Sequence, residues 1–158
     1  MEDVVIRGVS LEKNQAKVTI IGVPDKPGVA AGLFSALAEA GTNVDMIVQN
    51  VSLEGTTDMT FTLGKDDLPA AKKVIEAQVA KIGAKSHTAK DGISKLSVVG
   101  IGMRSHTGVA ATLFSALAGA GINIQMITTS EIKISVIINE AEGPRATQVV
   151  HDAFNLGT

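Results

Sequence analysis

The chain has 158 residues, of which 45% are hydrophobic and 3% aromatic, and its formal net charge is −2. Dispersed lysines and arginines argue against a nucleic-acid partner and against a basic membrane-binding patch. The absence of cysteine excludes disulfides, thiolate metal sites and cysteine nucleophiles. No run resembles a signal peptide or a spanning helix, so we expect a cytoplasmic protein without membrane contact.

An internal repeat divides the sequence into two similar halves. The stretch from Gly28 to Ile47 returns 80 residues later as Gly108 to Ile127, with 15 of the 20 positions identical. Such a repeat predicts two copies of one folding unit, each of about 75 residues, which is small for an independent core.

In chain order, the first half predicts the pattern β-α-β-β-α-β. Its expected strands, rich in β-branched residues, are residues 16–23, 43–51, 56–64 and 84–92. Its first expected helix begins near Val29 and stops at Gly41, and its second covers residues 66–82 with Pro69 in the first turn.

The second half predicts the same pattern without its last strand. We expect strands at residues 95–103, 123–130 and 133–139, a helix from Val109 to Ala120 and a helix over residues 142–154. No strand fits after the last helix, whereas residues 3–11 read as an unassigned strand. We therefore expect this N-terminal strand to cross over and complete the second sheet, giving domains of residues 16–92 and of residues 1–15 with 93–158.

The loop before the first repeated helix suits an anionic ligand. A helix N-terminus presents unpaired N–H groups and a partial positive charge, and Gly28 has no side chain to obstruct them. Pro27 stiffens the loop, Ala30 keeps the first turn uncrowded, and the Asp25 carboxylate is suited to accept from an ammonium or hydroxyl group. These features favour a zwitterion, although Asp25 acting only as a helix cap explains the same residues.

The second loop keeps Gly108 but replaces the acid with Ser105. It suits a similar ligand held less tightly, or none. Catalysis by Ser105 with His106 is disfavoured, because adjacent side chains rarely face one another and no acid is spaced to orient the histidine. Three scattered histidines without cysteine predict no metal site, and the glycines here lack the pattern of a dinucleotide loop.

Polar residues flank the strand after each repeated helix. Asn43 and Asn123 stand at equivalent positions, where each is either a turn residue or a polar group facing a ligand. Gln49 and Ser130, near the ends of the same strands, provide amide and hydroxyl groups for a polar pocket.

Two segments carry a resemblance to a known family, DKPGVAAGLFSALAEAGTNVDMIVQN and SHTGVAATLFSALAGAGINIQMITTSEIKISVII. They resemble the paired ACT domains of aspartate kinases. Over nearly the whole chain, the sequence is similar to the regulatory β subunit of an α2β2 aspartokinase. The resemblance implies an α+β fold of two ferredoxin-like βαββαβ domains, each an antiparallel sheet with helices on one face. It also implies an end-product amino acid, threonine, lysine or both, bound between an ACT domain of one chain and the other ACT domain of its partner. No other cofactor is expected.

The resemblance places one effector against the first loop, with a facing strand from the partner chain. The residues it implies are Asp25, Lys26, Pro27, Gly28, Val29, Ala30 and Gln49, with Asn123 and Ile124 of the second copy. Pseudo-symmetry adds a second site of Met103, Ser105, Gly108, Val109, Ala110 and Ser130, facing Asn43 and Val44. Some family members that bind lysine there have a hydroxyl residue where this chain has Ala110, so threonine at both sites stays an open alternative.

The resulting hypothesis is a non-catalytic regulatory subunit that forms a homodimer, binds the catalytic α subunit of aspartate kinase and mediates feedback inhibition of aspartate-family amino-acid synthesis. Two alternatives stay open: a structural dimerisation module without a ligand, and a small enzyme built on Ser105 and His106. No phosphate-binding loop for ATP is present in the sequence.

Overall fold

The structure is a computed structural model that describes residues 5–51, 54–101 and 106–154. The chain forms two compact units, Asn14–Asp91 and Met1–Lys13 with Gly92–Thr158, which we call the first-repeat and second-repeat units. The predicted domains and these units differ by one or two residues at each boundary. None of the helices within the described ranges is long and apolar enough to cross a bilayer.

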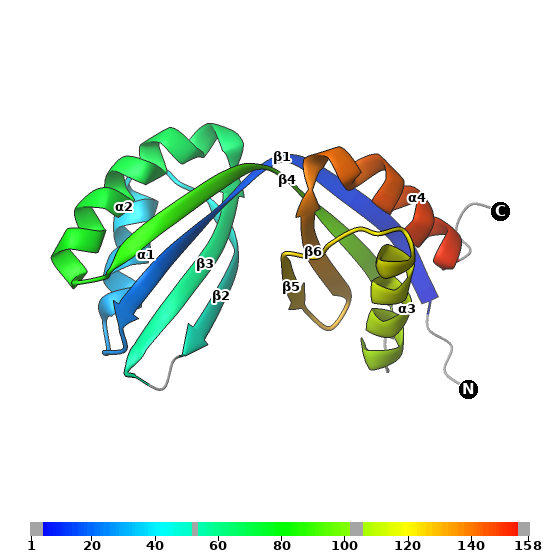
Figure 1. Ribbon diagram of the computed structural model, residues 1–158, viewed down its shortest axis with the longest axis horizontal. Helices are drawn as coiled ribbons and strands as arrows, with labels where there is room; N and C mark the ends of the chain where they lie inside the picture. Colours follow the sequence, from blue (N-terminus) through cyan, green and yellow to red (C-terminus); the bar gives the residue numbers. More distant parts are fainter. Residues whose placement is uncertain (1–4, 52–53, 102–105, 155–158) are drawn as a thin grey trace. The chain divides into compact units, whose positions relative to one another are not determined.

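In the first-repeat unit, four strands lie in the order β2-β3-β1-β4. The elements are β1 (Val5–Pro24), β2 (Val44–Val51), β3 (Thr56–Gly64), β4 (Ser86–Ile101), α1 (Val29–Glu39), a short 3-10 turn (Lys65–Asp67) and α2 (Leu68–Ile82). β3 pairs antiparallel with both β1 and β2, and Val18 lies opposite Phe61. Figure 1 shows α1 and α2 on one face of this sheet.

In the second-repeat unit, the order is β1-β4-β6-β5, which confirms that the N-terminal strand completes this sheet. The elements not yet given are α3 (His106–Gly119), β5 (Met126–Thr129), β6 (Lys133–Asn139), a 3-10 turn (Glu140–Glu142) and α4 (Gly143–Ala153). Each unit is therefore an antiparallel four-stranded sheet with two helices, as the predicted fold class requires.

Two of the predicted strand boundaries are wrong. The strands expected at residues 3–11 and 16–23 are one strand, β1, and those expected at 84–92 and 95–103 are one strand, β4; residues 3–4 and 102–103 lie outside the described ranges. The polar run from Glu12 to Gln15 resembles a turn in sequence but stays in the strand, with Asn14 at φ 58. β5 is shorter than predicted at both ends, since residues 123–125 precede the strand and Ser130 follows it.

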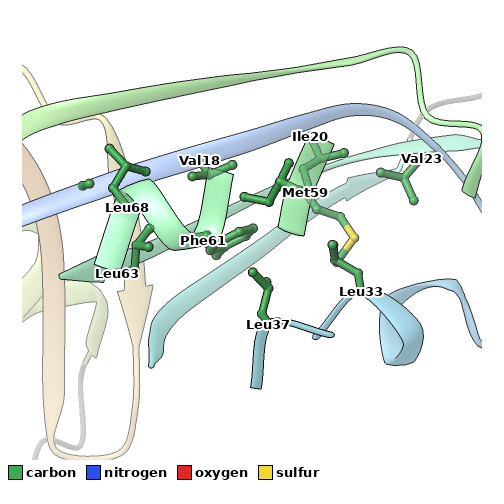
Figure 2. Packing of buried hydrophobic residues seen from close by; sticks show 12 residues of the cluster. Val18, Ile20, Val23, Leu33, Leu37, Met59, Phe61, Leu63 and Leu68 are labelled. Atoms are coloured by element: carbon green, nitrogen blue, oxygen red, sulfur yellow. The ribbon is translucent and has the colours of Figure 1, made fainter. Parts of the chain in front are cut away.

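The core of the first-repeat unit lies between its sheet and its helices. Figure 2 shows Val18, Ile20 and Phe61 of the sheet pointing toward α1, from which Leu33 and Leu37 extend. Phe61 is fully buried and meets the Phe34 ring edge to face at 5.6 Å. Burial of each such side chain contributes roughly 1.5–3 kcal/mol. This packing holds α1, and with it the loop before α1, against the end of β1.

The second-repeat unit has an equivalent core of aliphatic residues. Its fully buried members include Leu96, Val98, Leu113, Leu117, Ile134, Val136, Ile138, Ala146 and Val150. The periodicity that places Leu33 and Leu37 inward places Leu113 and Leu117 inward as well, so the repeat in sequence is also a repeat in packing.

Candidate functional site

The N-terminus of α1 is open and has no side-chain cap. A residue before proline is disfavoured in the helical conformation, so Lys26 and Pro27 delay the helix until Val29. Gly28 occupies the N-cap position at φ 90, a left-handed conformation that side-chain-bearing residues rarely adopt. A Cβ placed on Gly28 would meet nothing within 4 Å. The Val29 N–H donates to the Lys26 carbonyl at 3.4 Å, and no side chain caps the helix, so a carboxylate can approach the start of α1 without meeting a side chain at position 28.

Backbone hydrogen bonds hold the loop before α1 in place. The Asp25 N–H donates to the Gly55 carbonyl at 3.0 Å, and the Lys26 N–H donates to the Pro24 carbonyl at 3.0 Å. The side chains of Asp25, Lys26 and Pro27 are exposed. The backbone of the loop is thus fixed to the sheet while its side chains remain available to a ligand.

Gln49 lies at the same end of the sheet as the loop. In the ladder, Pro24 pairs with Thr56 and Gln49 pairs with Met59, three residues further along β3. Directly opposite residues of an antiparallel pair share a face, and Met59 belongs to the core beneath α1. Gln49 is exposed on that helix-bearing side.

A groove of about 500 Å³ opens beside the start of α1. It is lined by Pro27, Gly28, Val29, Gly32, Gln78, Lys81 and Ile82. Gln78 and Lys81 come from the last turns of α2 and were not predicted from the sequence. No local motif marks them, because only the packing of α1 against α2 places them near the loop. Lys81 adds a cation and Gln78 an amide to this side of the loop.

The second repeat has a different helix start. The prediction that Gly108 ends a loop is wrong, because α3 begins at His106 and contains Gly108. Thr107 stands where the first repeat has Pro27 and does not prevent the helix from starting earlier. The Gly108 carbonyl accepts a hydrogen bond from the Thr112 hydroxyl at 3.1 Å. Val109 is buried and Ala110 half-buried, while Met103 and Ser105 lie outside the described residues.

The remaining predicted site residues lie on and beside the edge strands. Asn43 is exposed just before β2, whose first residue is Val44. Asn123 and Ile124 precede β5 in the second-repeat unit, with Asn123 exposed. Ser130 follows β5, and its N–H donates to the Lys133 carbonyl at 2.7 Å. Within the described ranges, no three His, Cys, Asp or Glu side chains group as metal ligands do.

Comparison with known proteins identifies both repeats. The ACT domain family matches residues 17–80 and again residues 96–154. The aspartokinase of Mycolicibacterium smegmatis is 48% identical over 99% of this chain, but the chain spans 38% of that relative's length.

Two solved structures are similar over almost their entire chains. One comes from a crystal structure of aspartokinase α and β subunits, with 50% identity, a TM-score of 0.88, and coverage of 96% of this chain and 99% of the other. The other is the ligand-free regulatory subunit of aspartate kinase from Thermus thermophilus, with 43% identity, a TM-score of 0.87, and coverage of 95% and 99%. With the tandem fold and these matches together, the chain belongs to the family of two-ACT-domain regulatory subunits and regulatory regions of aspartate kinase.

Proposed function

We propose that this chain is the non-catalytic sensor of an aspartate kinase, binding an end-product amino acid at the loop before α1 and thereby mediating feedback inhibition. The observation that carries the proposal is the N-terminus of α1, which follows Gly28 at φ 90, has no side-chain cap and lies beside the exposed Asp25. The effector carboxylate binds the N–H groups at the start of α1, and its ammonium group binds the Asp25 carboxylate.

The effector is threonine, lysine or both, as the resemblance to aspartokinase regulatory subunits implies. Gln49 supplies a further polar contact from β2, and a second copy of the chain completes the site with Asn123 and Ile124. The exposed apolar side chains on edge strand β2, Ile47 at 50% and Val48 at 36%, support association of two copies. A catalytic α subunit, or a catalytic region of the same polypeptide, carries the kinase chemistry.

The second predicted site, at the start of α3, is expected to bind an amino acid more weakly. Its helix begins three residues earlier than α1 does in the repeat numbering, and Gly108 lies within the helix instead of at its cap. The proposal therefore assigns the tighter binding of an amino acid to the loop before α1.

Thermal unfolding with a panel of amino acids tests the proposal. A ligand at 100 times its Kd stabilises the folded protein by about 2.7 kcal/mol. For a protein of this size that raises Tm by about 5–10 °C. We expect this shift with threonine, and a loss of most of it in Asp25→Asn. Asp66→Asn, which removes an exposed carboxylate in the 3-10 turn before α2, is the matched control and should respond as the wild type does.

If threonine, lysine, methionine and isoleucine all leave Tm unchanged, the chain is a dimerisation module without a ligand. If threonine binds but Asp25→Asn responds like Asp66→Asn, the ammonium group is held elsewhere.

A further inference from the structure

β1 has a bulge against β3 shortly before the loop that precedes α1. The register of the two strands shifts between Ile20 and Val23, where two residues of β1 lie opposite Asp58 alone. A β-bulge bends its strand and increases the local twist, and bulges often lie beside functional sites, where they change the direction of a side chain or strand end. Gly22, the second residue of the bulge, comes three residues before Asp25. The bulge therefore sets the direction in which β1 enters the loop.

The side chain of Asp58 closes this bulge. The Gly22 N–H donates to the Asp58 Oδ1 at 3.0 Å. Side chains alternate between the two faces along a strand, and the neighbouring Met59 lies in the core beneath α1 (Figure 2), so Asp58 lies on the face without helices. Its carboxylate therefore acts on the backbone of β1 and not on a ligand at the start of α1.

The segment just before β4 contacts the same bulge. The Lys85 N–H donates to the Ile21 carbonyl at 2.9 Å. Gly22 has φ 69, and a Cβ placed on it would lie 3.1 Å from the Lys85 Cβ, so a residue with a side chain would be both strained and crowded at this position. Both residues of the bulge are thus held by hydrogen bonds, and the bond to Asp58 is the one that a single substitution removes without changing β1.

Asp58 lies between the strand that carries the loop and the strand that carries the predicted amide contact. On the β1 side, the chain leaves the bulge and the Asp25 N–H donates to the Gly55 carbonyl at 3.0 Å, which ties the loop to the start of β3. On the β2 side, Asp58 pairs in the ladder with Asn50, the neighbour of Gln49. A change at Asp58 therefore reaches the predicted site through the backbone.

We propose that Asp58 is a positioning residue of the amino-acid site: by accepting the Gly22 N–H, it holds the end of β1 so that the loop before α1 is already placed for its ligand. A loop that is ordered in advance binds more tightly, because less free energy is spent on ordering it during binding. That the loop binds an amino acid rests on the proposed function, whereas the effect of Asp58 on the loop backbone does not. Separate measurements test the two.

Two variants remove the acceptor and two others serve as comparisons. Asp58→Ala deletes the carboxylate, and Asp58→Val deletes it while introducing a residue that favours strands. Asp58→Asn keeps a side-chain oxygen that can accept the hydrogen bond. Thr60→Ala is the matched control, because Thr60 lies two residues along the same face of β3 and its hydroxyl shares a hydrogen bond of 3.0 Å with that of Thr19 on β1, where the register is regular.

Amide hydrogen exchange by NMR on the ligand-free protein reports on the loop. We expect the Gly22 and Asp25 N–H groups to exchange about tenfold faster in Asp58→Ala and Asp58→Val, because the local structure opens more easily. Asp58→Asn and Thr60→Ala should keep the wild-type rates at both groups. Urea unfolding should show similar losses of stability in Asp58→Ala and Thr60→Ala, so a general loss of stability would not explain the difference.

Calorimetry with threonine reports on the site. We expect the Kd for threonine to rise about tenfold in Asp58→Ala and Asp58→Val and to stay within about threefold of the wild-type value in Asp58→Asn and Thr60→Ala. If the wild type does not bind threonine, the proposed function fails, and faster exchange in Asp58→Val still supports the hold of Asp58 on the loop.

Wild-type exchange rates at Gly22 and Asp25 in Asp58→Val would overturn the proposal. So would a wild-type Kd in Asp58→Val despite faster exchange, or a Kd raised equally by Thr60→Ala. If Asp58→Ala fails to fold, Asp58→Val decides. Failure of both to fold would also overturn the proposal, since Asp58 would then be needed for the fold as a whole.

Discussion

Thr42→Val should stabilise the protein. Thr42 is 9% exposed, and its hydroxyl has no hydrogen-bond partner among the described residues. Its backbone N–H donates to the Leu37 carbonyl at 3.0 Å, closing the end of α1, and this bond does not involve the side chain. In the second repeat, Ile122 occupies the equivalent position, is 5% exposed, and donates from its N–H to the Leu117 carbonyl at 2.9 Å. One backbone site thus carries a buried hydroxyl in one unit and an alkyl group in the other.

The magnitude follows from the buried hydroxyl. An unpaired buried hydroxyl costs about 1–3 kcal/mol in protein mutational data. Valine has nearly the same shape without the polar group, so we expect a gain of about 1–2 kcal/mol, which raises Tm by about 2–8 °C. The reverse change, Ile122→Thr, loses a methylene equivalent of about 0.8 kcal/mol and buries a new hydroxyl, for a total loss of about 2–4 kcal/mol.

Urea unfolding followed by circular dichroism, with differential scanning calorimetry for Tm, measures both variants. The unfolding m-value should be unchanged, since the exposed surface hardly differs. A Thr42→Val protein no more stable than the wild type would refute the reasoning, because the hydroxyl would then have to be satisfied in the folded state.

Further predictions concern other side chains that folding buries. Ser97 and Ser135, each 2% exposed, share a hydroxyl hydrogen bond of 2.8 Å; either single alanine variant should lose about 1–3 kcal/mol, and the double variant should lose less than the sum in a urea-based double-mutant cycle. Burial, with a smaller contribution from the charge of Lys90, lowers the folded-state pKa of Lys17 below its usual 10.5. As pH rises toward 10.5, Lys17 therefore loses its proton in the folded protein before it does in the unfolded chain, and the free energy of unfolding should increase. Lys17→Met should flatten this increase in urea unfolding measured from pH 8 to 10.5. Phe61→Ala, at a fully buried site, should cost about 3–5 kcal/mol by the same assay, whereas a loss below 1 kcal/mol would contradict the described core.

Much of the fold could be predicted because each pattern of strand and helix residues occurs in both halves of the sequence. Apolar residues at helical spacing in α1 and α3 face inward as predicted, and the missing last strand of the second half correctly indicated the crossover of the N-terminal strand. The continuity of β1 and β4 could not be predicted from local patterns. The polar run before Ala16 resembles a turn, yet β1 continues through it with Asn14 at φ 58.

The candidate site was predictable only in its local part. The open N-terminus of α1 follows from Pro27 and Gly28, which stand in sequence beside the helix they limit. Gln78 and Lys81 lie beside the loop only because α2 packs against α1, and no short motif in the sequence encodes this packing. The early start of α3 was missed because the retained Gly108 suggested a loop, although the replacement of proline by Thr107 had removed the restraint on the helix.

Isothermal titration calorimetry with threonine and lysine, separately and together, tests the central claim most directly. The account predicts a saturable heat of threonine binding that is strongly reduced in Asp25→Asn and retained in Asp66→Asn. No saturable heat with either amino acid, alone or together, would contradict the claim that this chain is an amino-acid sensor.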